Sequence, residues 1–263
     1  MPTEFMYSRF ANPTCDAVEK KIAALEGGVG AMLTSSGQAA SMIAILNLCS
    51  AGDSFIAAST IYGGTINLFG VTLKKLGIEC IWADAEADEA EIQKLFKPNT
   101  KAVFGETLAN PALTVFDIEK WANIAHKNGV PLIVDNTFAT PILCRPIEFG
   151  ADIVIHSTTK YMDGHAVQGG GVIVDSGKFD WNASGRFPDF TEPDESYHGV
   201  VYTRDFGNMA YIIKARMQLM RDFGCYPAAH SAFLLNLGLE TLPVRMKRYC
   251  ENALTVAKHL QAS

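Results

Sequence analysis

The sequence predicts an α/β fold in which a mostly parallel sheet is covered by helices on both faces. Short apolar runs of the kind that form buried strands alternate along the chain with amphipathic stretches of helical period. With 263 residues, 48% of them hydrophobic and 19% charged, the chain is long enough to bury a large core. Repeated β-α-β units of this kind imply parallel strands joined by helices.

The expected elements follow one another in order. A first helix runs from about Ala17 to Leu25 and stops at Gly27-Gly28, and an apolar helix follows Gly37. We expect strands at residues 55–59, 79–82, 102–104, 132–134, 153–155 and 172–174, with helices at 65–76, 89–96 and 117–127. The polar, Asp-, Pro- and Ser-rich residues 178–196 predict a long surface loop. Helical patterns then cover 207–220, 228–237 and 245 to the end.

The composition argues against several classes of function. The net charge is −6 and the basic residues are scattered, so we expect no nucleic-acid partner. The sequence shows neither a signal peptide nor a membrane-spanning stretch, so the cytoplasm is the expected location. The six cysteines are widely separated, without a C-x-x-C pair, which fits a reducing compartment and argues against zinc; we expect no metal site.

The stretch from Asp152 to Lys160 holds the main candidate for chemistry. Ile153 to Ile155 predict a core strand, and Lys160 lies just beyond its carboxyl end, where open α/β sheets bind ligands. A lysine that loses water there presents a neutral amine more readily and can form a Schiff base with a carbonyl group. Ser157 and Thr159 can bond a phosphate beside it. Taken alone, however, such a stretch is more often a loop with a solvated lysine.

Other polar and aromatic side chains follow neighbouring strands. Asp135 directly ends the strand at 132–134, where a carboxylate needs a loop partner, water or a ligand cation. Tyr62 follows the strand at 55–59 and can cover a planar ligand, although an aromatic ring packed on the core is the commoner outcome. Asn110 follows the strand at 102–104 in an Asn-Pro pair that is also an ordinary turn signal.

Two further segments are candidates for binding an anion. Ser36, Gly37 and Gln38 begin an apolar helix, whose first N–H groups are suited to a phosphate, although Ser36 as a plain N-cap explains the local sequence equally well. Tyr7 and Arg9 lie on irregular chain before the first helix. The Arg9 guanidinium can grip a phosphate beside Tyr7, but an isolated arginine near a terminus is more often solvated.

These candidates together fit one cofactor. Pyridoxal 5′-phosphate needs an amine for its aldehyde, an acid for its ring nitrogen, an anion site for its phosphate and usually an aromatic face over its ring. Lys160, Asp135, the helix start at Gly37 and Tyr62 offer these groups on one predicted sheet. The sequence therefore predicts a pyridoxal 5′-phosphate site.

At these same residues the sequence resembles the cysteine and methionine metabolism family of fold-type I pyridoxal-phosphate enzymes, most of all its O-acetylhomoserine sulfhydrylases. The resemblance covers nearly the whole chain and implies the large domain of that fold, with a mostly parallel seven-stranded sheet. The matching motifs are Tyr7-Ser8-Arg9 with Asn12-Pro13-Thr14, Ser35-Ser36-Gly37-Gln38, Tyr62-Gly63-Gly64-Thr65, Asp135-Asn136-Thr137, His156-Ser157-Thr158-Thr159-Lys160-Tyr161 and Ser196-Tyr197-His198-Gly199.

The resemblance also implies a role for each matching residue. Lys160 would carry the cofactor as a Schiff base, Asp135 would pair with the ring nitrogen, and Tyr62 would stack on the ring and assist proton movement. Asn110 would lie near the phenolic oxygen. The remaining cofactor-binding residues would be Ser36, Gly37, Gln38, Thr137, Ser157 and Thr159. Tyr7 and Arg9 would reach the phosphate of a neighbouring subunit, which implies a dimer with shared sites and, usually, a homotetramer.

The implied reaction is γ-replacement, in which sulfide or a thiol replaces the acetate of O-acetylhomoserine to give homocysteine or methionine. The alternatives are a methionine or cystathionine γ-lyase and a non-catalytic cofactor-binding fragment. Gly64 and Thr65 stand where methionine γ-lyases typically carry a cysteine after the tyrosine, and this favours the sulfhydrylase.

The resemblance divides the chain into three parts. Residues 1–30 would serve the neighbouring subunit's site, residues 31–240 would form the cofactor domain, and residues 241–263 would begin a truncated C-terminal domain. Relatives carry the arginine for the substrate carboxylate in that last domain, so we expect the chain to be a fragment without it.

Overall fold

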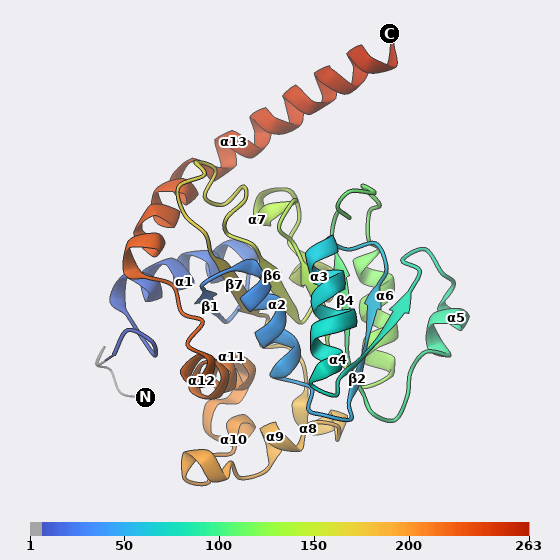
Figure 1. The fold of residues 1–263 in the computed structure, drawn as a ribbon, viewed down its shortest axis with the longest axis vertical. Helices are drawn as coiled ribbons and strands as arrows, with labels where there is room; N and C mark the ends of the chain where they lie inside the picture. The colour runs from blue at the N-terminus through green and yellow to red at the C-terminus, as the bar shows by residue number, and fades with distance from the viewer. Residues whose placement is uncertain (1–6, 263) are drawn as a thin grey trace.

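A seven-stranded sheet forms the centre of the computed structural model, which describes residues 7–262 (Figure 1). The strand order is β1-β7-β6-β5-β4-β2-β3. The strands are β1 (Gly30–Thr34), β2 (Ser54–Ala58), β3 (Glu79–Ala83), β4 (Thr100–Glu106), β5 (Leu132–Asp135), β6 (Ile153–His156) and β7 (Gly171–Asp175). Strands β2 to β6 pair in parallel, whereas β7 runs antiparallel to β1 and β6. The predicted mostly parallel, seven-stranded sheet is thus confirmed.

Helices join and flank these strands. The α-helices are α1 (Pro13–Glu26), α2 (Gly37–Leu46), α3 (Gly63–Asn67), α4 (Leu73–Lys75), α5 (Glu89–Gln93), α6 (Ile118–Lys127), α7 (Thr140–Leu143), α8 (Trp181–Ser184), α9 (Pro188–Thr191), α10 (Tyr202–Phe206), α11 (Ala210–Lys214), α12 (Arg221–Phe223) and α13 (Ala229–Gln261). The π-helical segments η1 (Leu68–Thr72) and η5 (Ala215–Met220) continue α3 and α11. The 3₁₀ segments are η2 (Pro146–Phe149), η3 (Glu195–Tyr197) and η4 (Gly207–Met209).

The side chains of β4 show that helices cover both faces of the sheet. Phe104 meets the ring of Phe69 in η1 edge-on, at 4.9 Å between ring centroids. Gly105, which faces the opposite way because strand side chains alternate, lies against Phe116, and Phe116 stacks on Trp121 of α6. The α3–α4 segment and α6 therefore lie on opposite faces, as the sequence predicted.

The first helix has clear local signals at both ends. The Asn12 side chain accepts hydrogen bonds from the N–H groups of Thr14 and Cys15, and Pro13 occupies the first helical position. Gly27 ends α1 in the left-handed conformation, with φ 79°. Glu26, the last residue of α1, is thereby turned into the core.

The structure corrects the prediction of a long surface loop at residues 178–196. This segment forms α8, α9 and η3, and it buries Trp181, Phe187 and Phe190. The ring of Trp181 stacks on Phe190, with 4.4 Å between centroids, and on Tyr211 of α11, with 5.7 Å between centroids. The three aromatic side chains bury enough apolar surface to order a segment that is otherwise polar.

The structure also joins the two helices predicted at the end of the chain. Residues 229–261 form one helix, α13, with Pro243 inside it. One side of α13 buries Leu235, Leu239, Leu242 and Met246. This apolar packing on both sides of Pro243 offsets the backbone hydrogen bond that a proline removes from a helix. Beyond Met246 the helix extends away from the sheet (Figure 1).

Candidate active site

The loops after β1, β2, β4, β5 and β6 meet at the carboxyl edge of the sheet. The strand register fixes this arrangement, because Glu106 pairs with Asp135 and Asp135 with Ile155 at the ends of three adjacent strands. On the other side of β7, Thr34 at the end of β1 pairs with Gly171. The predicted residues of these loops are therefore brought to one edge.

Asp135 is held by the loop that follows it. Its Oδ1 accepts hydrogen bonds from the backbone N–H of Thr137 at 3.0 Å and from the Thr137 hydroxyl at 2.5 Å. Burial raises the pKa of the Asp135 carboxyl, while the Thr137 bonds and the nearby His156 ring act in the opposite direction. The Thr137 oxygen also accepts from the N–H of Ser157 at 2.8 Å. Thr137 thus fixes the loop after β5 to the loop after β6.

The start of α2 lies against that second loop. Ser36 caps the helix by accepting from the N–H of Ala39 at 3.1 Å. A Cβ atom on Gly37 would lie 2.6 Å from Ser157 Cβ, so only glycine permits this approach. Gln38 Oε1 is buried and has no hydrogen-bond partner among the described residues. The helix N-terminus therefore opens beside Ser157, as the anion-site prediction requires.

Tyr62 is placed by the strands next to it. Its backbone N–H donates to Glu106 Oε2 at 2.7 Å, and its ring lies over Gly64, where an added Cβ would meet Tyr62 Cε1 at 2.5 Å. The same Cβ would lie 2.7 Å from Gln38 Nε2. With 47% of its surface exposed, Tyr62 does not take the alternative place in the core. The Tyr62 ring therefore lies at the surface of the carboxyl edge, after β2 and beside the start of α2.

Lys160 follows β6 in a turn. Its N–H donates to the carbonyl of Ser157 at 3.3 Å, and its carbonyl accepts from the N–H of Gly164 at 2.9 Å. Its side chain is exposed, and its amine has no hydrogen bond or ion pair within residues 7–262. The expected loss of water around this lysine is thus not seen in the chain by itself.

The remaining predicted residues stand in different places. The Thr159 hydroxyl bonds both the carbonyl and the N–H of Gly170, at 3.2 and 3.0 Å. Asn110 is partly exposed after β4, and its N–H bonds the Glu106 carboxyl. The Arg9 guanidinium donates to the carbonyl of Arg221 and lies 5.1 Å from the Tyr7 ring centroid. Arg9 thus contacts both the start of α12 and the Tyr7 ring.

Sequence reasoning missed the importance of Glu106. This carboxyl is buried, touches the backbone of Tyr62 and lies beside Asp135. Burial and the negative charge of Asp135 raise its pKa to about 8. Glu106 ends an apolar strand, as Asp135 does, and this position could have identified Glu106 as a candidate site residue in the same way.

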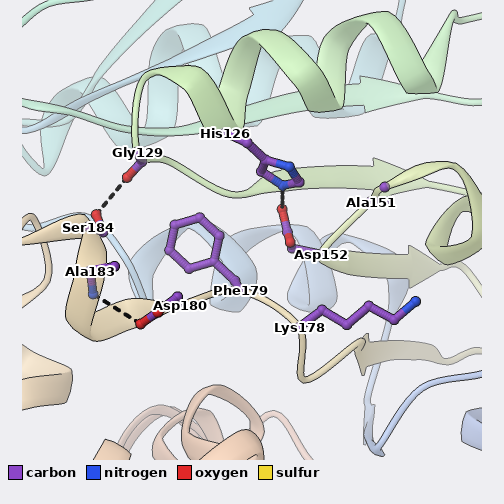
Figure 2. A pocket seen from close by; sticks show the side chains of 10 residues that line it. His126, Gly129, Ala151, Asp152, Lys178, Phe179, Asp180, Ala183 and Ser184 are labelled. Carbon is purple, nitrogen blue, oxygen red and sulfur yellow. Dashed lines mark hydrogen bonds and ion pairs between the residues drawn. The ribbon is translucent and has the colours of Figure 1, made fainter.

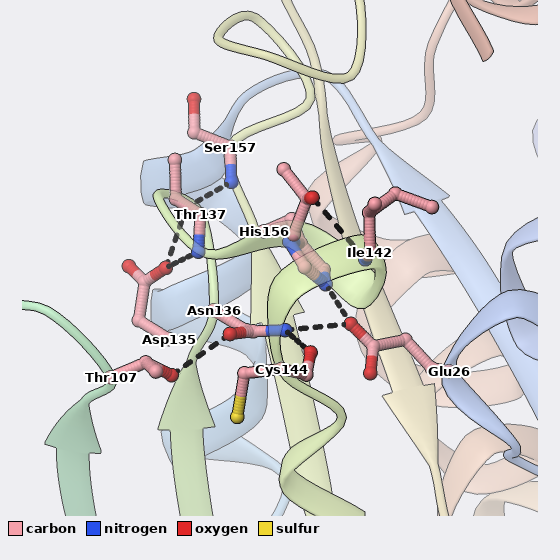
Figure 3. Close-up of polar contacts among 10 residues, drawn as sticks. Glu26, Thr107, Asp135, Asn136, Thr137, Ile142, Cys144, His156 and Ser157 are labelled. Carbon is pink, nitrogen blue, oxygen red and sulfur yellow. Dashed lines mark hydrogen bonds and ion pairs between the residues drawn. The ribbon is translucent and has the colours of Figure 1, made fainter. Parts of the chain in front are cut away.

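Sequence reasoning also missed a buried polar network behind Asp135 (Figure 3). Glu26 Oε1 lies 2.6 Å from His156 Nε2 and accepts from Asn136 Nδ2 at 3.0 Å. Asn136 Oδ1 in turn accepts from the Thr107 hydroxyl at 2.9 Å. Glu26 follows Ile22 by four residues on the buried side of α1, so helical period could have indicated its burial but not its partners.

A separate cleft of about 320 Å³ lies at the opposite edge of the sheet (Figure 2). His126 and Asp152 line it with a contact of 2.7 Å, together with Lys178, Phe179 and Ser184. Asp152 precedes β6, so the cleft is at the amino end of the strand whose carboxyl end leads to Lys160. The side chains predicted for the cofactor do not line it.

Two types of site are not found among the described residues. Within residues 7–262 no helix is both long and apolar enough to cross a membrane. The same residues bring together no group of three or more His, Cys, Asp or Glu side chains able to hold a metal ion.

Known proteins resemble this chain closely. It is 48% identical over 261 residues to a homocysteine/cysteine synthase of Saccharomyces cerevisiae, a match that covers 98% of this chain and 59% of that protein. It is 46% identical over 264 residues to an O-acetyl-L-homoserine sulfhydrylase of Leptospira meyeri, covering 97% and 59%. The chain thus spans about three fifths of the length of these relatives.

A solved structure from Campylobacter jejuni shows the same fold. It is described as an O-acetylhomoserine (thiol)-lyase with N′-pyridoxyl-lysine-5′-monophosphate, and it superposes with a TM-score of 0.94 at 38% identity. The match covers 98% of this chain and 64% of that one. A sequence profile of the Cys/Met metabolism PLP-dependent enzymes matches residues 1–263. The chain belongs to the Cys/Met metabolism PLP-dependent enzyme family.

Proposed function

We propose that this chain carries the cofactor site of an O-acetylhomoserine sulfhydrylase. The reaction replaces the acetate of O-acetylhomoserine with sulfide, or a small thiol, and yields homocysteine, or methionine. The observation that carries this proposal is that the loops at the carboxyl edge, beside Lys160, contact one another in series. At one end Gly37 touches Ser157, and Thr137 joins Ser157 to Asp135. At the other end the side chains of Gln38 and Tyr62 both lie against Gly64, and the Tyr62 N–H bonds Glu106. The names of the relatives support the choice of reaction.

The residues at this edge fit pyridoxal 5′-phosphate. The Lys160 amine is exposed and has no partner within residues 7–262, so it is available to an aldehyde. Because Gly37 has no side chain, the first N–H groups of α2 are uncovered beside Ser157. The positive end of the dipole of this ten-residue helix lies at the same place and favours a phosphate there. Asp135, Tyr62 and Asn110 would hold the ring nitrogen, cover the ring and approach its phenolic oxygen. Ser36, Gln38, Thr137 and Thr159 would complete the pocket.

When bound, pyridoxal phosphate supplies an electrophilic carbon and a ring that draws electron density from the α-carbon of an amino acid. The Asp135 carboxylate would hold a proton on the ring nitrogen, and Thr137 orients that carboxylate. The freed Lys160 amine would take the proton from the substrate's α-carbon. Tyr62 would limit water access and assist proton movement. In the net reaction the bond from Cγ to the acetate oxygen breaks and a bond from Cγ to sulfur forms.

Assembly, location and domain limits are part of the same proposal. Tyr7 is 56% exposed, and Arg9 lies beside it on the surface of the described chain, where both can serve a neighbouring subunit in a dimer or tetramer. All six cysteines are free, which supports a cytoplasmic location. Residues 1–30, 31–240 and 241–263 would act as the arm, the cofactor domain and the start of a C-terminal domain. The last of these limits falls inside α13.

Product analysis tests this function. The purified protein, loaded with pyridoxal phosphate, is given O-acetylhomoserine and sulfide, and homocysteine and acetate are measured. We expect both products from the unchanged protein and from Lys178→Ala, and none from Lys160→Ala. Formation of 2-oxobutyrate and methanethiol from methionine would instead assign a γ-lyase. A cofactor adduct without either set of products would leave a cofactor-binding part that lacks catalysis.

A further inference from the structure

Glu26 and His156 form a fully buried pair next to the proposed cofactor site. Both side chains have 0% exposure, and Glu26 Oε1 lies 2.6 Å from His156 Nε2 (Figure 3). The two residues come from the end of α1 and the end of β6 and are 130 positions apart in the sequence. The pair is therefore a product of the fold and joins two of its elements.

The same carboxyl oxygen holds the loop after β5. Glu26 Oε1 accepts from Asn136 Nδ2 at 3.0 Å, and that nitrogen also donates to the carbonyl of Cys144 at 2.9 Å. The opposite end of the Asn136 amide accepts from Thr107, so the amide is held on both sides. Asn136 directly follows Asp135 in the chain, about 3.8 Å away between Cα atoms. A movement of Asn136 would therefore move Asp135.

The arrangement is poorly suited to stability alone. Glu26 Oε2 and His156 Nδ1 are buried and have no partner within the described residues. A buried ion pair with unsatisfied atoms gives little net stability over apolar side chains of similar volume, because both groups lose water. What an apolar pair could not supply is a fixed acceptor for Asn136 and a polar group beside Asp135. The His156 ring is close enough to Asp135 to favour its ionised form.

We propose that Glu26, through Asn136 and His156, is a positioning residue for the Asp135 carboxylate and thereby for the ring nitrogen of pyridoxal phosphate. The inference rests on the proposed cofactor site. Glu26 makes no contact with the cofactor in this account. It holds the two loops whose relative position decides where the carboxylate of Asp135 lies.

The test compares two cofactors in the purified protein. One is pyridoxal phosphate, and the other is its deaza analogue, in which carbon replaces the ring nitrogen. Glu26→Leu has a side chain of similar volume but removes the acceptor that His156 and Asn136 share. We expect this change to weaken pyridoxal phosphate binding by about tenfold or more, as for other residues that orient a ligating group, and to leave binding of the analogue within about twofold. Asp135→Asn is the benchmark and should show the same selectivity.

Asn136→Ala serves as a second variant if Glu26→Leu does not fold, because it removes the amide that links Glu26 to the loop after β5, and the same selective loss is expected. Glu26→Gln, which keeps an oxygen for both donors, should bind pyridoxal phosphate nearly as well as the unchanged protein. Asp152→Asn, at the other end of β6, is the matched control and should change neither affinity. An equal loss for both cofactors would show a merely structural role and overturn the inference, as would no loss for either. Failure of the unchanged protein to bind pyridoxal phosphate at Lys160 would instead refute the proposed site itself.

Discussion

The two ends of strand β6 carry the same kind of side-chain pair in opposite surroundings. At the amino end, His126 contacts Asp152 at the wall of an open cleft, and 40% of the His126 side chain is exposed (Figure 2). At the carboxyl end, His156 contacts Glu26 with no exposure of either side chain (Figure 3). Asp152 is buried, with 4% of its side chain exposed, so water reaches the His126 ring in the first pair but neither side chain in the second. The carboxyl edge, where an α/β sheet binds ligands, thus holds a His–Glu pair in which neither side chain is exposed to water.

The largest expected effect is the loss of stability when the buried pair is broken. Glu26→Ala leaves the His156 Nε2 group and one of the two Asn136 amide N–H groups buried without an acceptor, so we expect the free energy of unfolding to fall by about 3–5 kcal/mol. Urea denaturation of the cofactor-free protein measures this change. A loss no greater than that of Asp152→Ala would remove the contrast between the two ends.

The next effect concerns Glu106, whose pKa is raised from 4.5 to about 8 by burial and by Asp135. Because the folded state holds this proton more tightly than the unfolded state, the stability it supports is complete below pH 4.5 and is lost as pH rises through about 8. Glu106→Gln should therefore stabilise the cofactor-free protein by about 2–4 kcal/mol at the upper end of this range and hardly at its lower end. Denaturation curves at several pH values test the slope, and an equal gain at every pH would contradict it.

The smallest effect is expected at the open end of β6. The hydrogen bond that His126 donates to Asp152 raises the pKa of His126 above 6.5, so the stability from this pair is present below pH 6.5 and fades as pH rises through the higher folded value. Asp152→Asn should cost under about 1 kcal/mol through His126, since water screens the half-exposed ring, and the difference should shrink at alkaline pH. Melting temperatures of both proteins at pH values near 6 and near 9 compare the two conditions. A difference that grows toward alkaline pH would be contrary to this account.

The same contrast explains what the sequence could predict. Strands such as Ile153–His156 are continuous apolar runs, so their composition alone located them in the sequence. The polar side chains that follow these strands lie at one edge of the sheet because parallel strands end at the same edge. Strand β1 was missed because Gly30–Thr34 lacks β-branched apolar residues and begins with Gly and Ala. Its pairing with β7, rather than its local sequence, makes it a strand.

Predictions failed where distant partners decide the structure. Trp181, Phe187 and Phe190 lie among polar residues without a regular period, and the segment is ordered by their ring contacts with one another and with Tyr211 and by hydrogen bonds to distant residues. The gap predicted between the helices at 228–237 and 245 to the end is helical in the structure, and the helix packs on the core on both sides of Pro243. Glu26 and His156 are each unremarkable in their local sequence. Their pairing depends on the tertiary fold, which brings the end of α1 to the end of β6.

The measurement that most directly tests the account is the mass of the lysine peptides after borohydride reduction of the protein with pyridoxal phosphate. Lys160 and Lys178 are both exposed lysines, one after the carboxyl end of β6 and the other at the cleft near its amino end. We predict the loss of a visible absorption band on reduction and a pyridoxyl group on Lys160, with none on Lys178. A modified Lys178 with an unmodified Lys160, or no adduct on either, would contradict the assignment of the carboxyl edge as the cofactor site.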